Sequence, residues 1–236
     1  MPTPEAVLDR ARQAGVTVIA TGTHPAQWQW LQSIQGVRKA YGLHPEAIPE
    51  AGDWQSALRA CLSEDPTAAI GEVGLDWRAG FADREIQVRC LRDQLALALE
   101  WDRAVILHVV KAHEAMLAIL ADFPGLRFTV HAFTGSSEIA DQYLALGGYL
   151  SAGGLVTRKP APRVCAVFAS MPADRLLLES DAPDLPMAGH TVSDPTHLPE
   201  IGRILATLRG VSTASLATQT QQNAQALFGS GCVQSD

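Results

Sequence analysis

The sequence predicts an α/β fold built on a parallel sheet, either open and doubly wound or closed into a barrel. Two observations support this fold class. Short apolar runs of strand length alternate with longer amphipathic stretches of helix length along the whole chain. Several of the runs are apolar on both faces, as strands buried within a parallel sheet are. Because no low-complexity linker or internal repeat interrupts the alternation, we expect a single domain over residues 1–236.

Seven runs are predicted strands, and they follow one another at the spacing of βα units. They cover residues 16–23, 37–44, 68–75, 104–110, 127–133, 148–156 and 175–180. A closed α/β barrel has eight parallel strands, so the chain is one strand short of that number.

Helices are expected between the strands, with recognisable ends. Thr3-Pro4 begins the first helix, which ends at Gly15, and Asp53 begins the next clear one. Further helices are expected over residues 82–101, 111–123, 136–146, 161–170, 196–209 and 212–228. The stretch 182–195, rich in Pro, Asp and Gly, follows the last strand and is typical of an active-site loop.

Apolar side chains on two of the helical stretches are expected to pack against the sheet. In the longest helix, over residues 82–101, the spacing assigns Ile86, Val88, Leu91, Leu95, Leu97 and Leu99 to this face. Trp28, Trp30 and Trp101 also fall at helical positions, and we expect packing rather than base stacking from them.

Composition excludes several classes of protein. The chain is 47% hydrophobic and 18% charged, which suits a globular core, and its net charge of −7 argues against a protein that coats nucleic acid or an anionic membrane. We see no secretory signal, membrane span or obligate protein partner. Cys61, Cys90, Cys165 and Cys232 are widely spaced, which indicates reduced thiols and a cytoplasmic protein.

Four ionisable residues lie at strand ends, where α/β barrels carry their catalytic groups. Glu72 follows Gly71 in the third run, His108 interrupts the apolar fourth run, His131 follows the fifth, and Asp181 follows the last. Taken singly, each has a structural explanation, such as a core histidine or a capping aspartate. Taken together, four such buried groups need mutual compensation, because an unpaired buried charge costs several kcal/mol. Two imidazoles and two carboxylates that bind a common divalent cation would compensate one another in this way. This mixed set of nitrogen and oxygen ligands suits Zn²⁺, Mn²⁺ or Mg²⁺.

The segments that carry these residues resemble the successive signatures of the TatD-type metal-dependent hydrolases, which are deoxyribonuclease-like members of the amidohydrolase superfamily. They are Gly71-Glu72-Val73-Gly74-Leu75-Asp76, Leu107-His108, His131-Ala132-Phe133-Thr134-Gly135 and Glu179-Ser180-Asp181-Ala182-Pro183. Gly42-Leu43-His44-Pro45 and the C-terminal Asn223-Ala224 and Leu227-Phe228-Gly229 also resemble family segments.

This resemblance implies a (β/α)8 TIM-type barrel with a two-metal hydrolytic site. Glu72 would bridge the two ions, His108 and His131 would bind the second, and Asp181 would bind the first and accept a proton from the attacking water. The implied cofactors are two divalent ions, Mg²⁺, Mn²⁺ or Zn²⁺, and the implied substrate is DNA, at its ends or as short single strands. A hydrolase of ester or amide bonds, such as an aminoacyl–tRNA linkage, is an alternative on the same site.

The sequence departs from the family pattern at its start. The family's first strand ends in a His-x-His pair that completes the first metal site, and no two of the seven histidines here stand two residues apart. Either the native protein begins upstream, which we favour, or the chain is a barrel without its first strand and with an impaired first metal site. His24 and His44 also lie at strand ends, and either could line the pocket or replace a lost ligand weakly, although we do not expect such a rescue. After Asp181, the Asn and basic residue of many family members are missing from the loop.

Overall fold

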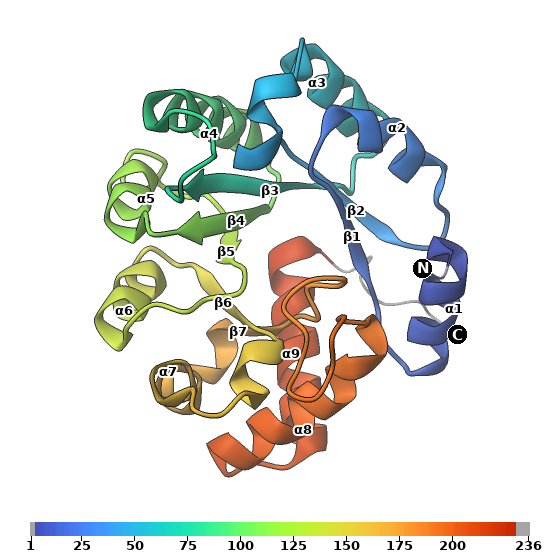
Figure 1. The fold of residues 1–236 in the computed structure, drawn as a ribbon, viewed down its shortest axis with the longest axis vertical. Helices are drawn as coiled ribbons and strands as arrows, with labels where there is room; N and C mark the ends of the chain where they lie inside the picture. Colours follow the sequence, from blue (N-terminus) through green and yellow to red (C-terminus); the bar gives the residue numbers. More distant parts are fainter. Residues whose placement is uncertain (1–2, 230–236) are drawn as a thin grey trace. The chain divides into compact units, whose positions relative to one another are not determined.

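The computed structural model describes residues 3–229 and contains the predicted alternation of strands and helices (Figure 1). In this part of the chain there are seven strands: β1 (Ile19–Gly22), β2 (Arg38–Tyr41), β3 (Ala69–Asp76), β4 (Val105–Val110), β5 (Phe128–Val130), β6 (Tyr149–Ala152) and β7 (Leu176–Leu178). Each strand lies within one residue of the range that the sequence predicts for it. The α/β, TIM-type (β/α) fold class is thus confirmed.

Nine α-helices are described between residues 3 and 229. They are α1 (Pro4–Gln13), α2 (Pro25–Ser33), α3 (Trp54–Glu64), α4 (Arg84–Glu100), α5 (His113–Leu120), α6 (Ser137–Ala145), α7 (Pro162–Ser170), α8 (Leu198–Arg209) and α9 (Thr213–Phe228). Thr3 and Asp53 cap α1 and α3, as predicted, because their side-chain oxygens accept hydrogen bonds from backbone amides of the first turn. The sequence had not defined α2 or the short 3-10 helix η1 (Pro45–Glu50). None of the described helices is both long and apolar enough to cross a membrane.

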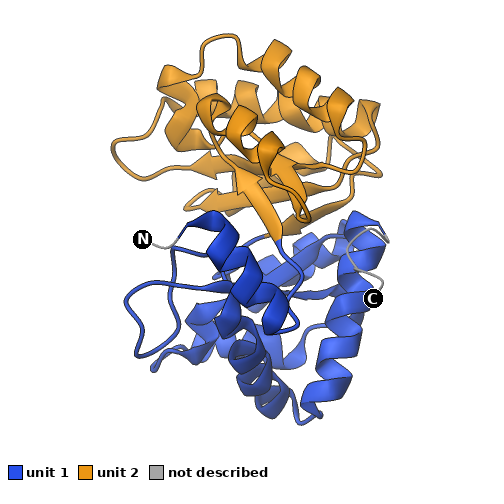
Figure 2. Ribbon diagram, turned by 90° about the vertical axis from the view of Figure 1, so that its right-hand side faces the viewer, with its two compact units in different colours: residues 1–18, 131–236 blue, residues 19–130 orange. Residues whose placement is uncertain are grey.

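The chain divides into two compact units, drawn in separate colours in Figure 2. Unit 2 is residues 19–130, and it contains β1 to β5, which pair in chain order with all pairs parallel. Unit 1 is residues 1–18 and 131–236, and it contains the parallel pair β6 and β7. The single domain expected over residues 1–236 remains a prediction.

The core of each unit is built from strands that are apolar on both faces. In unit 2, Ile70, Val73 and Leu75 of β3 are fully buried, although consecutive side chains of a strand point to opposite faces. In unit 1, Leu150 of β6 and Leu176 of β7 are buried in the same way. Cys61 is buried, Cys90 and Cys165 are half-buried, and all three are free thiols. Cys232 lies outside the described residues.

Helix α4 packs differently from the prediction. Ile86 and Leu99 are 37% and 40% exposed, so their assignment to the sheet face was wrong. Gln87 and Gln94 are buried instead. Their side chains bind backbone groups at or just beyond the strand ends: Gln94 Oε1 accepts from the Leu43 amide at 2.7 Å, and Gln87 Oε1 accepts from the Asp76 amide at 2.8 Å. Buried backbone groups must find partners, and here an amide side chain is favoured over an apolar one.

The tryptophans also differ from one another. Trp28 of α2 is buried, as predicted, and its indole nitrogen donates to the Gly22 carbonyl. Trp30 is 49% exposed, so the prediction of packing was wrong for this residue. The two positions lie about 200° apart around a helix, and for that reason only one of them can face the sheet.

Two glycines allow β3 and β4 to approach closely. A Cβ at Gly74 would lie 1.9 Å from the carbonyl oxygen of His108, and a Cβ at Gly71 would lie 2.6 Å from Cβ of Ile106. The register also shifts between them: Ile70 pairs with Val105, but Val73 pairs with Leu107. Three residues of β3 therefore span two of β4, which is a bulge, and bulges re-aim side chains. Glu72 lies inside this bulge.

We expect Gly74→Ala to destabilise the protein by more than about 2 kcal/mol, because the added methyl meets backbone atoms that no side-chain movement can clear. Gly202→Ala is the matched control. Its Cβ would meet only the end of the Leu178 side chain, at 3.3 Å, and a helical alanine is favoured over glycine by about 1 kcal/mol. Urea unfolding of both variants measures the difference. Equal stabilities would contradict the close approach of β3 and β4.

Candidate metal centre

Unit 2 brings together two of the four residues predicted to form the site. Glu72 lies in the β3 bulge, and His108 lies on β4 where it pairs with Gly74. A ligand atom of Glu72, one of His108 and one of His44 all lie within 4.8 Å of one another. The side chain of His108 is only 13% exposed. A carboxylate and an imidazole at this separation suit one divalent ion.

His44 is the third member of this group, and the sequence named it as a candidate to line the pocket or to replace a lost ligand weakly. It follows β2 and caps η1, because its Nδ1 accepts from the Glu46 amide at 3.1 Å. Its ring meets the ring of His108 edge-on, with the centroids 4.4 Å apart. Since Nδ1 is an acceptor here, a neutral His44 carries its proton on Nε2, and in this state neither ring nitrogen offers a lone pair to an ion.

His24 repeats this arrangement one strand earlier. Its Nδ1 accepts from the Ala26 amide at 3.0 Å and so caps α2. Among the described residues, His24 belongs to no group whose ligand atoms meet at metal-binding distances. Its position is explained by helix capping.

Asp76, the last residue of β3, is a site residue that the sequence analysis left without a role. Its carboxylate is completely buried, and Oδ2 lies 3.0 Å from Nε2 of His108. The Arg78 guanidinium binds both carboxylate oxygens. Burial alone would raise the pKa of Asp76, but the hydrogen bonds from Arg78 and His108 outweigh it and lower the pKa to about 2. The signal available in the sequence was an aspartate that ends the same strand as Glu72.

Unit 1 brings together the other two predicted residues. His131 is the first residue of the second of the two chain segments that form unit 1, residues 131–236, and Asp181 follows β7. His131 Nδ1 lies 3.8 Å from Asp181 Oδ1 and 3.9 Å from Oε1 of Glu179. All three side chains are largely buried, with exposed fractions between 10% and 17%. One imidazole and two carboxylates therefore meet at the start of the loop that the sequence predicts to be an active-site loop.

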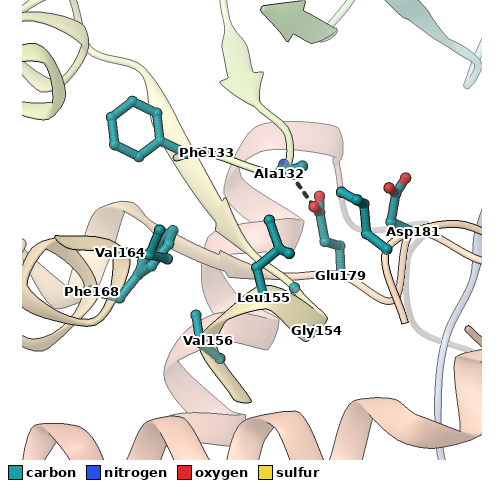
Figure 3. Close-up of a pocket in the computed structure, with 11 residues that line it drawn as sticks. Ala132, Phe133, Gly154, Leu155, Val156, Val164, Phe168, Glu179 and Asp181 are labelled. Atoms are coloured by element: carbon teal, nitrogen blue, oxygen red, sulfur yellow. Dashed lines mark hydrogen bonds between the residues drawn. The ribbon is translucent and has the colours of Figure 1, made fainter. Parts of the chain in front are cut away.

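Glu179 holds the backbone next to His131. Its Oε1 accepts from the Ala132 amide at 2.6 Å, and Figure 3 shows this carboxylate pointing at that amide. Ala132 has a φ of 45°, a left-handed conformation that is unfavourable for alanine. Asp181 has a similar φ of 54°. Glu179 and Asp181 line one end of a small pocket whose other walls are apolar, including Phe133, Leu155 and Phe168.

The donor atoms fit divalent metals. Each unit offers imidazole nitrogen and carboxylate oxygen in a largely buried setting, the mixed set that Zn²⁺ and Mn²⁺ accept. No cysteine thiolate belongs to the groups found among residues 3–229, so a metal that prefers sulfur is not favoured.

Parallel (β/α) units with imidazoles and carboxylates at strand ends are typical of metal-dependent hydrolases. The chain belongs to the TatD related DNase family, whose family model matches residues 2–229. It is 36% identical over 238 residues to the 3′-5′ ssDNA/RNA exonuclease TatD of Erwinia tasmaniensis, covering 94% of this chain and 92% of that protein. It is 30% identical to the metal-dependent hydrolase YabD of Bacillus subtilis, over 95% of this chain and 92% of that protein.

A solved structure supports the same assignment. The crystal structure of YJJV, a TatD homologue from Escherichia coli K12, superposes with a TM-score of 0.87 at 32% sequence identity, covering 95% of this chain and 91% of that one. A TatD family hydrolase from Entamoeba histolytica shares the fold, with a TM-score of 0.81 at 20% identity. The family resemblance seen in the sequence is confirmed, and the chain is a TatD-type metal-dependent hydrolase that acts on ester bonds.

We expect Glu179→Ala to lower the free energy of unfolding by about 1–3 kcal/mol, because the Ala132 amide loses its acceptor in a largely buried setting. Glu179→Gln keeps an acceptor oxygen and is expected to lose less. Asp141→Ala, which removes an exposed carboxylate from α6 of the same unit, is the control and is expected to change stability by less than about 0.5 kcal/mol. Urea unfolding checks all three variants. A loss in Glu179→Ala no larger than in the control would contradict the role of Glu179.

Proposed function

We propose that this chain is a divalent-metal-dependent nuclease that hydrolyses phosphodiester bonds at the ends of single-stranded DNA or RNA. The observation that carries the proposal is the 36% identity, over nearly the full length of both chains, with a protein named as a 3′-5′ ssDNA/RNA exonuclease. The paired imidazoles and carboxylates in both units supply the chemistry that such a reaction needs.

The metal ligands of the proposal are Glu72, His108, His131 and Asp181, as the family resemblance implies. In unit 2, Glu72 and His108 hold their ligand atoms close enough for a shared ion. In unit 1, His131 and Asp181 approach to 3.8 Å. Two ions of Mg²⁺, Mn²⁺ or Zn²⁺ complete the proposal.

Asp181 is the proposed proton acceptor. A divalent ion, when bound, lowers the pKa of the attacking water and offsets the charge that develops on the phosphate. Asp181 Oδ1 is a largely buried carboxylate oxygen that is held near His131 and lines a pocket. A carboxylate within hydrogen-bonding reach of a water can take its proton, which contributes about 10²–10⁴-fold to the rate.

The loop after β3 suits a nucleic-acid strand. The guanidinium group of Arg84 stacks over the ring of Trp77, with 4.4 Å to the centroid, and that of Arg78 stacks over Phe81 at 4.9 Å. Both arginine side chains are exposed. Guanidinium groups bind phosphate oxygens and stack on bases, and aromatic rings add stacking for single strands.

The net charge of −7 favours strand ends or short single strands over long duplexes, because binding to a long duplex relies on bulk positive charge. A cytoplasmic location, where reduced cysteines and nucleic-acid substrates occur together, is part of the proposal.

The test uses Asp181→Asn, because an amide cannot accept the proton. Wild-type protein with Mn²⁺ or Mg²⁺ should shorten labelled single-stranded oligonucleotides, and EDTA should abolish this activity. We expect Asp181→Asn to reduce kcat at least about 100-fold. Asp184→Asn, in the same loop and exposed, is the matched control and should retain the wild-type rate.

Two outcomes would overturn the proposal. If Asp181→Asn keeps the metal-dependent rate, the role of Asp181 is wrong. If the wild type cleaves no oligonucleotide but hydrolyses acylated substrates, such as aminoacyl esters, the chain is instead an ester or amide hydrolase. Oligonucleotides blocked at the 3′ or the 5′ end establish the direction of cleavage in the same assay.

A further inference from the structure

We propose that Asp76 is a positioning residue that fixes His108 as its Nε2–H tautomer, so that the lone pair of Nδ1 is the one offered to a divalent ion. The effect on metal binding rests on the proposed function, whereas the tautomer of His108 can be observed in the protein without any metal.

The hydrogen bond between Asp76 and His108 determines which ring nitrogen carries the proton. Asp76 Oδ2 and His108 Nε2 are 3.0 Å apart, a normal distance for a charge-assisted hydrogen bond. An ionised carboxylate can only accept, so the proton of this bond must belong to Nε2. A neutral imidazole has a single N–H, and Nδ1 is then left with its lone pair. A metal ligand must offer such a lone pair.

The position of Asp76 is fixed by its neighbours. Its side chain has no exposure to solvent, and its backbone is held at both ends: the amide donates to Gln87 Oε1 at 2.8 Å, and Gln87 Nε2 donates to the Asp76 carbonyl at 2.9 Å. The residue pairs in register with Val110 of β4. Asp76 therefore cannot turn away from His108 without breaking several buried hydrogen bonds.

The charge on Asp76 depends on Arg78. The Arg78 guanidinium donates to both carboxylate oxygens from a half-exposed position. This contact keeps the carboxylate ionised within the buried site, so that it accepts rather than donates toward His108. Arg78 is thereby part of the same chain of contacts, although it does not touch His108 directly.

Carboxylates often bind the second nitrogen of a metal-binding histidine and so orient its ring, and loss of this contact typically costs about 10–100-fold in metal affinity. Here the arrangement directs Nδ1 of His108 to the side of the ring opposite Asp76. Glu72 and His44 are the other two members of this group, and a ligand atom of each lies within 4.8 Å of a ligand atom of His108.

A purely structural role for Asp76 is the competing explanation. In that case Asp76 would serve only to bind Arg78 and end β3, and the tautomer of His108 would be unaffected by its loss. The two explanations differ in the nitrogen chemical shifts of one imidazole ring, which stability measurements do not report.

The experiment is NMR of the ¹⁵N-labelled, metal-stripped full chain at neutral pH, with the His108 ring signals assigned by their absence in His108→Gln. We expect the wild-type ring to show a protonated Nε2 and an unprotonated Nδ1. In Asp76→Asn the two nitrogens should shift toward a mixture of tautomers. Asp53→Asn makes the same chemical change at the exposed cap of α3 and should leave the wild-type pattern unchanged.

The second readout is the affinity for Mn²⁺ alone, measured by calorimetry. We expect Asp76→Asn to weaken it by about 10–100-fold and Asp53→Asn to leave it unchanged. A wild-type His108 protonated on Nδ1 would overturn the proposal, even if Asp76→Asn does not fold. A wild-type Nε2–H tautomer that persists in folded Asp76→Asn would overturn it as well. Failure of the nuclease proposal would leave the tautomer result standing, so the two are distinguishable.

Discussion

The close approach of β3 and β4 is the constraint on which the metal-binding group of unit 2 depends. Parallel strands hold their backbones at a nearly fixed spacing, and a side chain at Gly71 or Gly74 would not fit between them. The bulge between Ile70 and Val73 then turns Glu72 toward the ring of His108. If larger residues replaced these glycines, their side chains would push β3 and β4 apart. The Glu72 carboxylate and the His108 imidazole would then be too far apart to share an ion.

Both units use buried carboxylates to fix the surroundings of a histidine. In unit 2, Asp76 bonds the ring of His108 itself. In unit 1, Glu179 bonds the backbone amide that follows His131 and stabilises Ala132 in an unfavourable conformation. The two contacts differ in what they control: the first determines which nitrogen carries the proton, and the second determines the path of the chain. In both, a buried charge is tolerated because its oxygens have partners.

Most of the fold could be predicted from the sequence, because strands buried in a parallel sheet are recognisable apolar runs and helix caps are local signals. The exceptions have physical reasons. Gln87 and Gln94 are buried, and Ile86 and Leu99 are not, because the strand ends leave backbone groups that need hydrogen bonds. The spacing of apolar residues along a helix does not indicate where such hydrogen bonds are needed. Glu72 and His108 were recognised by their polarity within apolar runs. Asp76 and His108 are 32 residues apart in sequence, and their contact depends on the register of β3 against β4, which no local pattern contains.

The central claim is that Glu72 and His108 hold a divalent ion, and calorimetric titration of the metal-stripped chain with Mn²⁺ tests it most directly. We expect the double variant Glu72→Gln, His108→Gln to bind at least one ion fewer per chain than the wild type. The exposed pair Glu85→Gln, Arg89→Gln on α4 serves as the control and should keep the wild-type stoichiometry. Equal stoichiometry and affinity in the wild type and the site variant would contradict the account.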